Sequence, residues 1–331
     1  MSEVLVIIPH LNKLALLKEC LVHLDSQSYD SYDIMIVDNG SSDDSPEYIS
    51  KLTSEKNKYH SILLNNNMGF AYAVNKGIEY SIKNNYKFSL LLNNDAFIKD
   101  GFVENLTHAI KKSDDIFATS SLMLSYKDID KIDSYGDYYN VLGWSFQGHI
   151  SETVDDINDI EYPFSACAGA AIYRNAILER IGLFDNNFFA YLEDIDISYR
   201  AKLYGYRITT CKSAVCYHLG SQTSGSRYNE FKVRISARNN IYLLHKNMPM
   251  IQILINIFPL FIGHCIKFIF FMTKGFGVDY FFGIVDGLRN AKKIKKINFN
   301  EINLFQLIYI ELELLINTFK YIFNFAKRHL N

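Results

Sequence analysis

The sequence predicts an α/β protein in which a mostly parallel central sheet is flanked by helices and followed by a helical C-terminal region. The first observation is that short apolar runs alternate with amphipathic helical patterns over residues 4–92, as in strand–helix–strand units. The second is composition: 49% of the 331 residues are hydrophobic and 21% are charged, which is enough for a sizeable core. The third is that the chain becomes both apolar and basic beyond about residue 230.

The predicted strands are short apolar runs that suit burial on both faces of a sheet. They are Val4–Pro9, Ile34–Val37, Ser61–Leu64 and Phe88–Leu92. Between them, leucines at helical spacing predict a helix over residues 14–24. Ser45 followed by Pro46 predicts a helix start, and residues 71–82 predict a third helix.

The middle of the chain is less regular. Residues 120–162 are acidic and hold scattered glycines, so we expect a connection with one or two hairpins. Residues 163–220 carry the densest polar pattern of the sequence. We therefore place one α/β domain at residues 1–225 and a helical region at residues 226–331.

The C-terminal region is expected to form three helical stretches. They cover residues 231–246, 250–272 and 302–325. The middle stretch has the length of a membrane span, but its polar interruptions favour a helix lying in the membrane interface or a broken hairpin. The basic residues that follow it, which could sit on anionic head groups, are Arg289, Lys292, Lys293, Lys295 and Lys296.

Charge separates the two parts of the chain. The net charge is −2, but residues 1–230 carry −11 and residues 231–331 carry +9. A basic and apolar surface favours an anionic membrane over nucleic acid, and we expect no nucleic-acid partner. The start, Met1-Ser2-Glu3, lacks the basic segment of a secretion signal, so we expect a cytosolic protein with free thiols.

Polar residues stand where the predicted strands end, and active sites of parallel sheets lie at that edge. Asn93, Asn94 and Asp95 follow the fourth run, and Asn93 and Asp95 point the same way from an extended chain. A carboxylate there can hold Mg²⁺ or Mn²⁺ on the phosphate oxygens of a ligand. A plain turn is the alternative interpretation.

Two more loops meet the same edge. Asp38 ends the second run and can accept hydrogen bonds from a nucleobase or ribose, or can form a turn before Gly40. Gly69 precedes the third helix and permits a close approach of backbone to a ligand. The chain has no G-x-G-x-x-G and no G-x-x-x-x-G-K-[ST] sequence, which argues against a dinucleotide dehydrogenase or a P-loop enzyme.

The sharpest cluster is Glu193-Asp194-x-Asp196-x-x-x-Arg200, which follows an aromatic stretch. Apolar neighbours raise the proton affinity of a carboxylate, which suits a general base. On a helix, Asp196 and Arg200 could pair. Acidic residues at a helix start are the alternative interpretation. His218, further on, could complete a cation site begun by Asp95, although a lone histidine is more often structural.

Together these segments resemble the inverting family 2 glycosyltransferases of the GT-A fold, especially their rhamnosyltransferase-like branch, over residues 4–218. The order and spacing of the motifs carry the resemblance. They are Val6-Ile7-Ile8-Pro9-His10-Leu11-Asn12, Ile36-Val37-Asp38-Asn39-Gly40-Ser41-Ser42-Asp43, Asn67-Met68-Gly69-Phe70-Ala71, Leu91-Leu92-Asn93-Asn94-Asp95, Gly169-Ala170-Ala171, Gly182-Leu183-Phe184-Asp185, Glu193-Asp194-Ile195-Asp196 and Tyr217-His218.

The resemblance implies a role for each matching residue. A nucleotide-sugar donor, dTDP-, UDP- or GDP-linked, would be held by Pro9, His10, Asn12, Asp38, Asn67, Gly69, Asn93 and Asn94. Asp95 would bind a divalent cation, Mg²⁺ or Mn²⁺, with His218 as a second ligand. Asp194 would be the catalytic base, with Glu193 beside it. Gly169 and Ala170 would lie by the acceptor. Asn93 replaces the first acid of the family's D-x-D motif, so we expect weaker metal binding.

The resemblance also implies a biological setting. The expected reaction adds a sugar, with inversion, to a glycan or lipid-linked glycan during the synthesis of cell-surface polysaccharide. The basic, apolar C-terminal region favours a peripheral or monotopic protein on the cytoplasmic side of the cell membrane. Its helices could instead cover the α/β domain or form a homodimer interface. A non-catalytic, membrane-attached nucleotide-sugar or glycan binder is the alternative function. A sugar-1-phosphate nucleotidyltransferase is disfavoured, because it would need a Gly-rich basic loop after the first strand and this sequence has none there.

Overall fold

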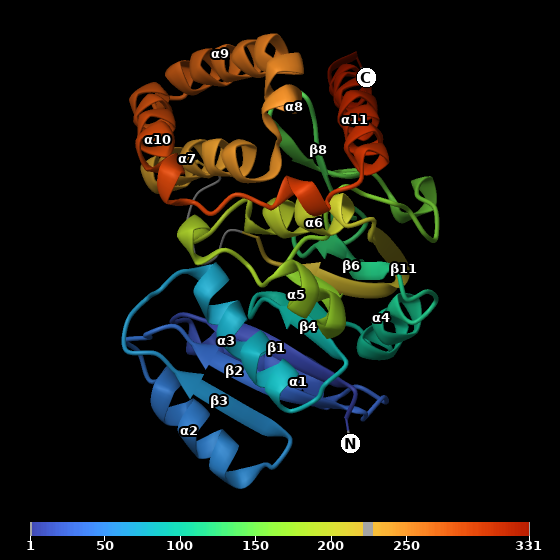
Figure 1. The fold of residues 1–331 in the computed structure, drawn as a ribbon. Helices are drawn as coiled ribbons and strands as arrows, with labels where there is room; N and C mark the ends of the chain where they lie inside the picture. The colour runs from blue at the N-terminus through green and yellow to red at the C-terminus, as the bar shows by residue number, and fades with distance from the viewer. Residues whose placement is uncertain (1, 221–227, 331) are drawn as a thin grey trace.

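The computed structural model describes residues 2–220 and 228–330 (Figure 1). The strands of its main sheet are β1 Val4–His10, β2 Tyr32–Asp38, β3 Tyr59–Leu63, β4 Phe88–Leu92, β5 Ala96–Ile98, β6 Ile116–Ser125, β7 Ile132–Ser134, β10 Ala170–Arg174 and β11 Arg207–His218. A separate hairpin is formed by β8 Asp137–Tyr139 and β9 Ser145–Gln147. Within the described ranges, the nine strands of the main sheet run in the order β3-β2-β1-β4-β10-β6-β11-β5, with β7 paired to β6.

Helices cover both faces of the sheet and form one end of the molecule. They are α1 Leu14–Asp25, α2 Ser45–Glu55, α3 Phe70–Lys83, α4 Phe102–Ile110, α5 Asn175–Ile181, α6 Glu193–Leu203, α7 Glu230–Asn247, α8 Met250–Ile255, α9 Ile257–Thr273, α10 Gly277–Asn290 and α11 Leu304–Leu330. Short 3₁₀ turns are η1 Val154–Asp156, η2 Asn186–Phe188, η3 Ala291–Lys293 and η4 Phe299–Glu301.

The N-terminal half is built as the sequence predicts. Strand β1 pairs in parallel with β2 and with β4, and all the predicted strands and helices are present. Side chains alternate across β1: Val4, Val6 and Ile8 join the core on the α1 and α4 side, whereas Leu5 and Ile7 join the core on the α3 side. This burial on both faces fixes the register that brings the carboxyl ends of β1, β2 and β4 to one edge.

The second half of the sheet corrects the expectation of a mostly parallel arrangement. Strand β10 runs antiparallel between β4 and β6, and β5 runs antiparallel to β11, so the sheet is mixed. The apolar pattern of a strand does not reveal the direction in which the strand runs in the sheet. The antiparallel strands were therefore not predicted from the sequence. Strand β6 also extends to Ser125, into the stretch expected to be irregular, and there it buries Leu122, Met123 and Leu124.

The C-terminal helices lie together at the end of the molecule away from α2 and β3 (Figure 1). The apolar stretch is broken at Asn256 into α8 and α9, as the polar interruptions predicted. Among residues 2–220 and 228–330, no helix combines the length and apolarity that crossing a bilayer requires. Tyr199 of α6, Leu243 of α7 and Leu314 of α11 share one core, so this region packs on the α/β part. The proposed boundary at residues 225 and 226 lies outside the described residues, and the division into domains stays a prediction.

Candidate active site

A cavity of about 630 Å³ lies at the predicted edge of the sheet. Eleven of the candidate residues line it, drawn from segments far apart in the sequence. They are Pro9, His10, Asn67, Gly69, Asn93, Asn94, Asp95, Gly169, Glu193, Asp194 and His218. The structure therefore brings Asp95 and Asp194 together in one cavity, and their chemical roles stay predictions.

His10 connects three loops beneath this cavity. Asn94 donates from Nδ2 to His10 Nδ1 at 2.8 Å, so the imidazole proton resides on Nε2, which lies 2.8 Å from Ser45 Oγ. Burial lowers the pKa of His10, which keeps the ring neutral. His10 thus holds the Asn94 turn against the start of α2 and gives a fixed wall to the site.

The loop before α3 is held by Asn39, a residue to which the sequence gave no role. Asn39 donates to Asn67 Oδ1 and to the carbonyl of Gly69, and accepts from the amide of Met68. Gly69 has φ of +91°, and a Cβ there would lie 2.6 Å from the Phe189 carbonyl oxygen. Only glycine fits at this position, because the loop passes directly over the segment that leads to α6.

Three candidate residues do not line the cavity. Asp38 is buried and accepts hydrogen bonds from the amide and hydroxyl of Ser41, which is the turn role left open above. Asn12 accepts from the amide of Ser42 and so ties the loop after β1 to the loop after β2. Ala170 is fully buried at the start of β10, whereas its neighbour Gly169 reaches the cavity and accepts from the amide of Asn93.

Asp95 and His218 meet because β5 pairs with β11. His218 Nε2 lies 3.5 Å from Asp95 Oδ1, and His218 Nδ1 lies 2.7 Å from Asp133 Oδ2 on the far side of the ring. Burial lowers the pKa of His218, but the hydrogen bonds to Asp133 and Asp95 outweigh it and raise the pKa to about 9. Asp133, on β7, was not among the predicted residues.

This pair has the donor atoms that a divalent cation requires, once the cation displaces the proton from His218 Nε2. Histidines that bind metals in proteins usually donate the N–H of their second ring nitrogen to a carboxylate, which orients the ring. Asp133 stands in that position relative to His218. The described residues contain no group of three or more His, Cys, Asp or Glu suited to a metal. One carboxylate and one imidazole nevertheless fit Mg²⁺ or Mn²⁺ when a substrate diphosphate supplies the other oxygens.

Asp194 stands at the junction of two cavities. With Glu193 it lines both the first cavity and a second one of about 680 Å³. Asp194 Oδ1 accepts from the amide of Ile195 at 2.8 Å. Burial raises the pKa of Asp194 to about 6, as the aromatic stretch before it predicted. Burial together with the charge of Asp194 also raises the pKa of Glu193, so the two carboxyl groups are not ionised to the same extent.

The segment leading into α6 has a strained backbone. Phe189, Tyr191 and Leu192 have φ between +64° and +69°, a conformation that bulky side chains rarely adopt. Asn239 of α7, fully buried, donates from Nδ2 to the carbonyls of Phe188, Ala190 and Tyr191. A helix of the C-terminal region therefore fixes the backbone that positions Glu193 and Asp194.

Helix α6 is anchored by a buried ion cluster. Asp196 accepts from Arg200, as the spacing predicted, and also from Lys246 and Asn247 of α7. Lys246 Nζ lies 2.7 Å from Asp185 Oδ2 as well. Two cations facing two carboxylates satisfy these buried charges, and the cluster locks α6 against α7.

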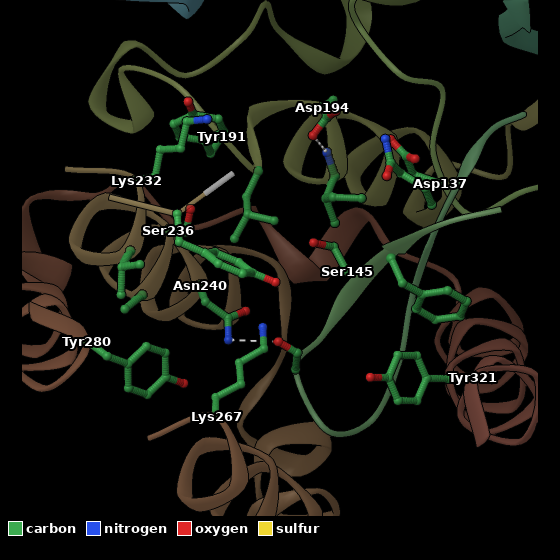
Figure 2. Close-up of a pocket in the computed structure, with 18 of the residues that line it drawn as sticks. Asp137, Ser145, Tyr191, Asp194, Lys232, Ser236, Asn240, Lys267, Tyr280 and Tyr321 are labelled. Atoms are coloured by element: carbon green, nitrogen blue, oxygen red, sulfur yellow. Dashed lines mark hydrogen bonds between the residues drawn. The ribbon is translucent and has the colours of Figure 1, made fainter. Parts of the chain in front are cut away.

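The second cavity is enclosed by the hairpin β8–β9 and by helices of the C-terminal region (Figure 2). Its polar lining residues include Asp137, Ser145, Lys232, Asn240 and Lys267. Burial raises the pKa of Asp137, and the nearby charge of Asp194 adds to the effect. Sequence patterns do not predict this cavity, because its walls come from loops and helices that share no motif.

The chain is similar to known proteins over much of its length. The family model for glycosyl transferase family 2 matches residues 5–182, just over half of the chain. Glycosyltransferase GlyG of Streptococcus pneumoniae serotype 4 is 29% identical over 147 residues, which cover 44% of this chain and 46% of that protein. Poly-beta-1,6-N-acetyl-D-glucosamine synthase of Staphylococcus aureus strain COL is 25% identical over 229 residues, or 66% of this chain and 50% of that protein. The chain spans about half the length of these relatives.

Solved structures share its architecture. GalNAc-T7 with UDP, GalNAc and Mn²⁺ matches with a TM-score of 0.60 at 12% identity, over 74% of this chain and 48% of that one. Mannosyltransferase PcManGT from Pyrobaculum calidifontis, in complex with GDP-Man and Mn²⁺, gives 0.55 at 14% identity, over 88% and 75%. Residues 1–349 of S. aureus TarS give 0.51 at 16% identity, over 80% and 72%. At these identities the likeness establishes the fold, which is the GT-A fold.

Proposed function

Because the chain belongs to glycosyl transferase family 2, we propose that it moves a sugar from a nucleoside diphosphate donor to a hydroxyl of a glycan acceptor, with inversion. One observation carries the proposal: Asp95 and Asp194 line a single cavity, and Asp194 also lines a second cavity on its other side. A donor and an acceptor can therefore reach the same carboxylate from two directions.

The donor belongs in the first cavity. Its wall of neutral polar groups, which includes His10, Asn67 and Asn94, suits a nucleoside and its diphosphate. Two structural neighbours were solved with UDP or GDP-Man, which supports a nucleotide sugar here. A rhamnosyl donor, expected from the resemblance, is part of the proposal, and dTDP-, UDP- and GDP-sugars are the candidates to test.

Asp95 and His218 would hold a divalent cation, Mg²⁺ or Mn²⁺. Bound there, the cation would neutralise negative charge on the diphosphate leaving group. Asp133 keeps the His218 ring in the orientation that directs Nε2 toward Asp95. The presence of Mn²⁺ in two structural neighbours supports this part of the proposal.

The base is Asp194. Its carboxylate removes the proton from the acceptor hydroxyl as that oxygen forms a bond to the anomeric carbon. The bond from the anomeric carbon to the diphosphate oxygen breaks on the opposite face, so the configuration inverts and nucleoside diphosphate leaves. A carboxylate with a pKa raised to about 6 is a stronger base than an exposed aspartate and still largely ionised at neutral pH. Among the described residues, Glu193 Oε2 has no hydrogen-bond partner and can accept from the acceptor beside it.

The acceptor and the cellular setting are also proposed. Large apolar side chains are exposed on α8, α9, α10 and α11, among them Phe258 at 77% and Phe305 at 77%. With the net charge of +9 over residues 231–331, this surface suits an anionic bilayer. We infer a peripheral or monotopic protein on the cytoplasmic side of the membrane that acts in cell-surface polysaccharide synthesis. The apolar surface and the polysaccharide synthase among the relatives support it.

A donor screen tests the function. The full chain is incubated with dTDP-, UDP- and GDP-sugars, with and without Mn²⁺ or Mg²⁺, and release of nucleoside diphosphate is measured. We expect release from one donor class, increased by the cation. A non-catalytic binder, the alternative function, would bind a nucleotide sugar in the same assay and release nothing from any donor.

A further inference from the structure

The second cavity has a carboxylate at one end and a lysine at the other. In Figure 2, Asp194 and Lys267 lie at opposite ends of the space, with Ser145 and Asn240 between them. Glu193 and Asp137 line the cavity together with Asp194, whereas Lys267 comes from the apolar helix α9. The cavity thus has carboxyl groups around the proposed base and the Lys267 ammonium group at its far end, and Lys232 also lines it.

Among the described residues, Lys267 has no anionic partner. Within residues 2–220 and 228–330, its ammonium group makes no hydrogen bond and no ion pair, and its recorded contact is with the Trp144 ring, 6.0 Å from the ring centroid. Burial lowers the pKa of Lys267 to about 8, with no carboxylate near enough to raise it again. The side chain of Lys267 is half-buried, and an unpaired cation that is partly removed from water favours an anionic partner.

The surroundings of Lys267 are apolar. Phe271, Tyr280, Tyr321 and Phe325 line the same cavity. On the outer side of α9, Phe258 is 77% exposed and Phe261 is 68% exposed. A ligand that fills this space therefore meets carboxyl groups, the two lysines Lys232 and Lys267, and an apolar helical surface beyond Lys267.

We propose that Lys267 binds a phosphate group carried by an amphipathic acceptor, an alkyl-linked sugar phosphate or diphosphate whose free hydroxyl lies at Asp194. This rests on the proposed function and narrows it to one class of acceptor. The phosphate supplies the charge that Lys267 lacks, the sugar spans the cavity, and the alkyl chain extends toward the exposed face of α9. Lys267 is in this account a specificity residue and takes no part in bond making.

Trp144, the single tryptophan of the chain, gives the readout, because its ring lies beside the Lys267 ammonium. The probes are decyl phosphate, decanol and inorganic phosphate, titrated into the full chain while tryptophan fluorescence is recorded. We expect decyl phosphate to bind most tightly. Lys267→Met should weaken its binding by about 10-fold or more, since a charge-assisted hydrogen bond is lost. Lys267→Arg should retain most of the affinity, and Lys274→Met, at an exposed site just after α9, should retain all of it.

Three results would overturn the inference. Equal affinity for decanol and decyl phosphate would mean that no anion is recognised, and equal affinity for inorganic phosphate would mean that the alkyl chain plays no part. If Lys267→Met bound decyl phosphate as tightly as the unaltered chain does, Lys267 would not be the residue that binds the phosphate. If that variant does not fold, the affinities of the unaltered chain for the three probes still show whether the cavity recognises an alkyl phosphate. Donor hydrolysis without acceptor is measured on the same preparations, so loss of the acceptor inference with donor hydrolysis intact leaves the proposed function standing.

Discussion

At the scale of single residues, the environment of Asp194 determines how the site responds to pH. Burial raises the pKa of this carboxylate to about 6. The hydrogen bond from the Ile195 amide stabilises the ionised form and so opposes a larger rise. A base works only when deprotonated, so activity should be full above that pKa and should fall as the pH drops through it. We expect kcat/KM to decrease by about 10-fold per pH unit below pH 6.

The pH profile is measured with saturating cation, and donor binding is followed separately at each pH. A profile that stays flat from pH 7 down to pH 4.5 would contradict the assignment, because no buried base would then be titrating.

Asp95 has a different proposed role, which predicts a different defect. Asp95→Asn keeps the shape of the side chain and removes the carboxylate that faces His218 Nε2. We expect donor affinity to fall in the presence of Mn²⁺ by about 10-fold or more, because a ligand of the cation on the diphosphate is lost. This affinity is measured by titrating a nucleoside diphosphate into the protein with and without Mn²⁺. An affinity equal to that of the unaltered chain in both titrations would remove the metal role.

At the scale of elements, the interesting contact lies between α7 and the strained segment before α6. Asn239 donates to three carbonyls of residues 188–191 and so holds the backbone that positions the base. Asn239→Leu should lower kcat more than it changes donor affinity. The expected loss of stability is about 1–3 kcal/mol for each carbonyl left unpaired.

Asn317→Leu is the matched control. Asn317 is also a buried asparagine, on α11, and it donates to the Tyr139 carbonyl at 2.9 Å, outside the segment that leads to α6. Denaturant unfolding should show a loss of stability in both variants, larger in Asn239→Leu because more carbonyls lose a donor, while kcat falls only in Asn239→Leu. Equal kcat in the two variants would mean that Asn239 has a purely structural role.

The elements also show what sequence can and cannot give. Residues at the ends of β1, β2 and β4 were predicted to meet because parallel buried strands place their carboxyl ends together, and the cavity there contains Pro9, His10 and Asn94. Asp133 was not predicted, because it joins His218 only through the pairing of β7 with β6, in a stretch with no apolar period. Asn239 was missed for a similar reason: a polar residue inside a helix carries no sign of its distant carbonyl partners.

At the scale of the whole molecule, the helical end is both part of the core and an exposed apolar surface. Leu243 and Leu314 pack with Tyr199 of the helix that carries the base, so deleting the C-terminal region would damage the fold. Substitutions on the exposed face are therefore the better test of membrane binding. The mixed sheet and the second cavity are whole-molecule properties, and they depend on pairings between distant segments that local sequence patterns do not encode.

Flotation on vesicles tests the membrane surface. We expect the chain to float with phosphatidylcholine vesicles that contain phosphatidylglycerol, and less without it, since each basic residue near the surface contributes about 1 kcal/mol. Phe258→Glu combined with Phe261→Glu should reduce flotation, because both rings are exposed on α9. Ile129→Glu, at an exposed site outside these helices, is the control and should float normally. If the double variant floated as well as the unaltered chain, this face of α9 would not be the membrane-binding surface.

The measurement that tests the central claim most directly is the rate of sugar transfer by Asp194→Asn, made alongside its affinity for the donor. The substitution keeps the size of a side chain that stands between two cavities and removes its ability to accept a proton. The account predicts a rate lower by about 10²–10⁴-fold with donor affinity nearly unchanged. A variant that transfers sugar at the full rate would contradict it.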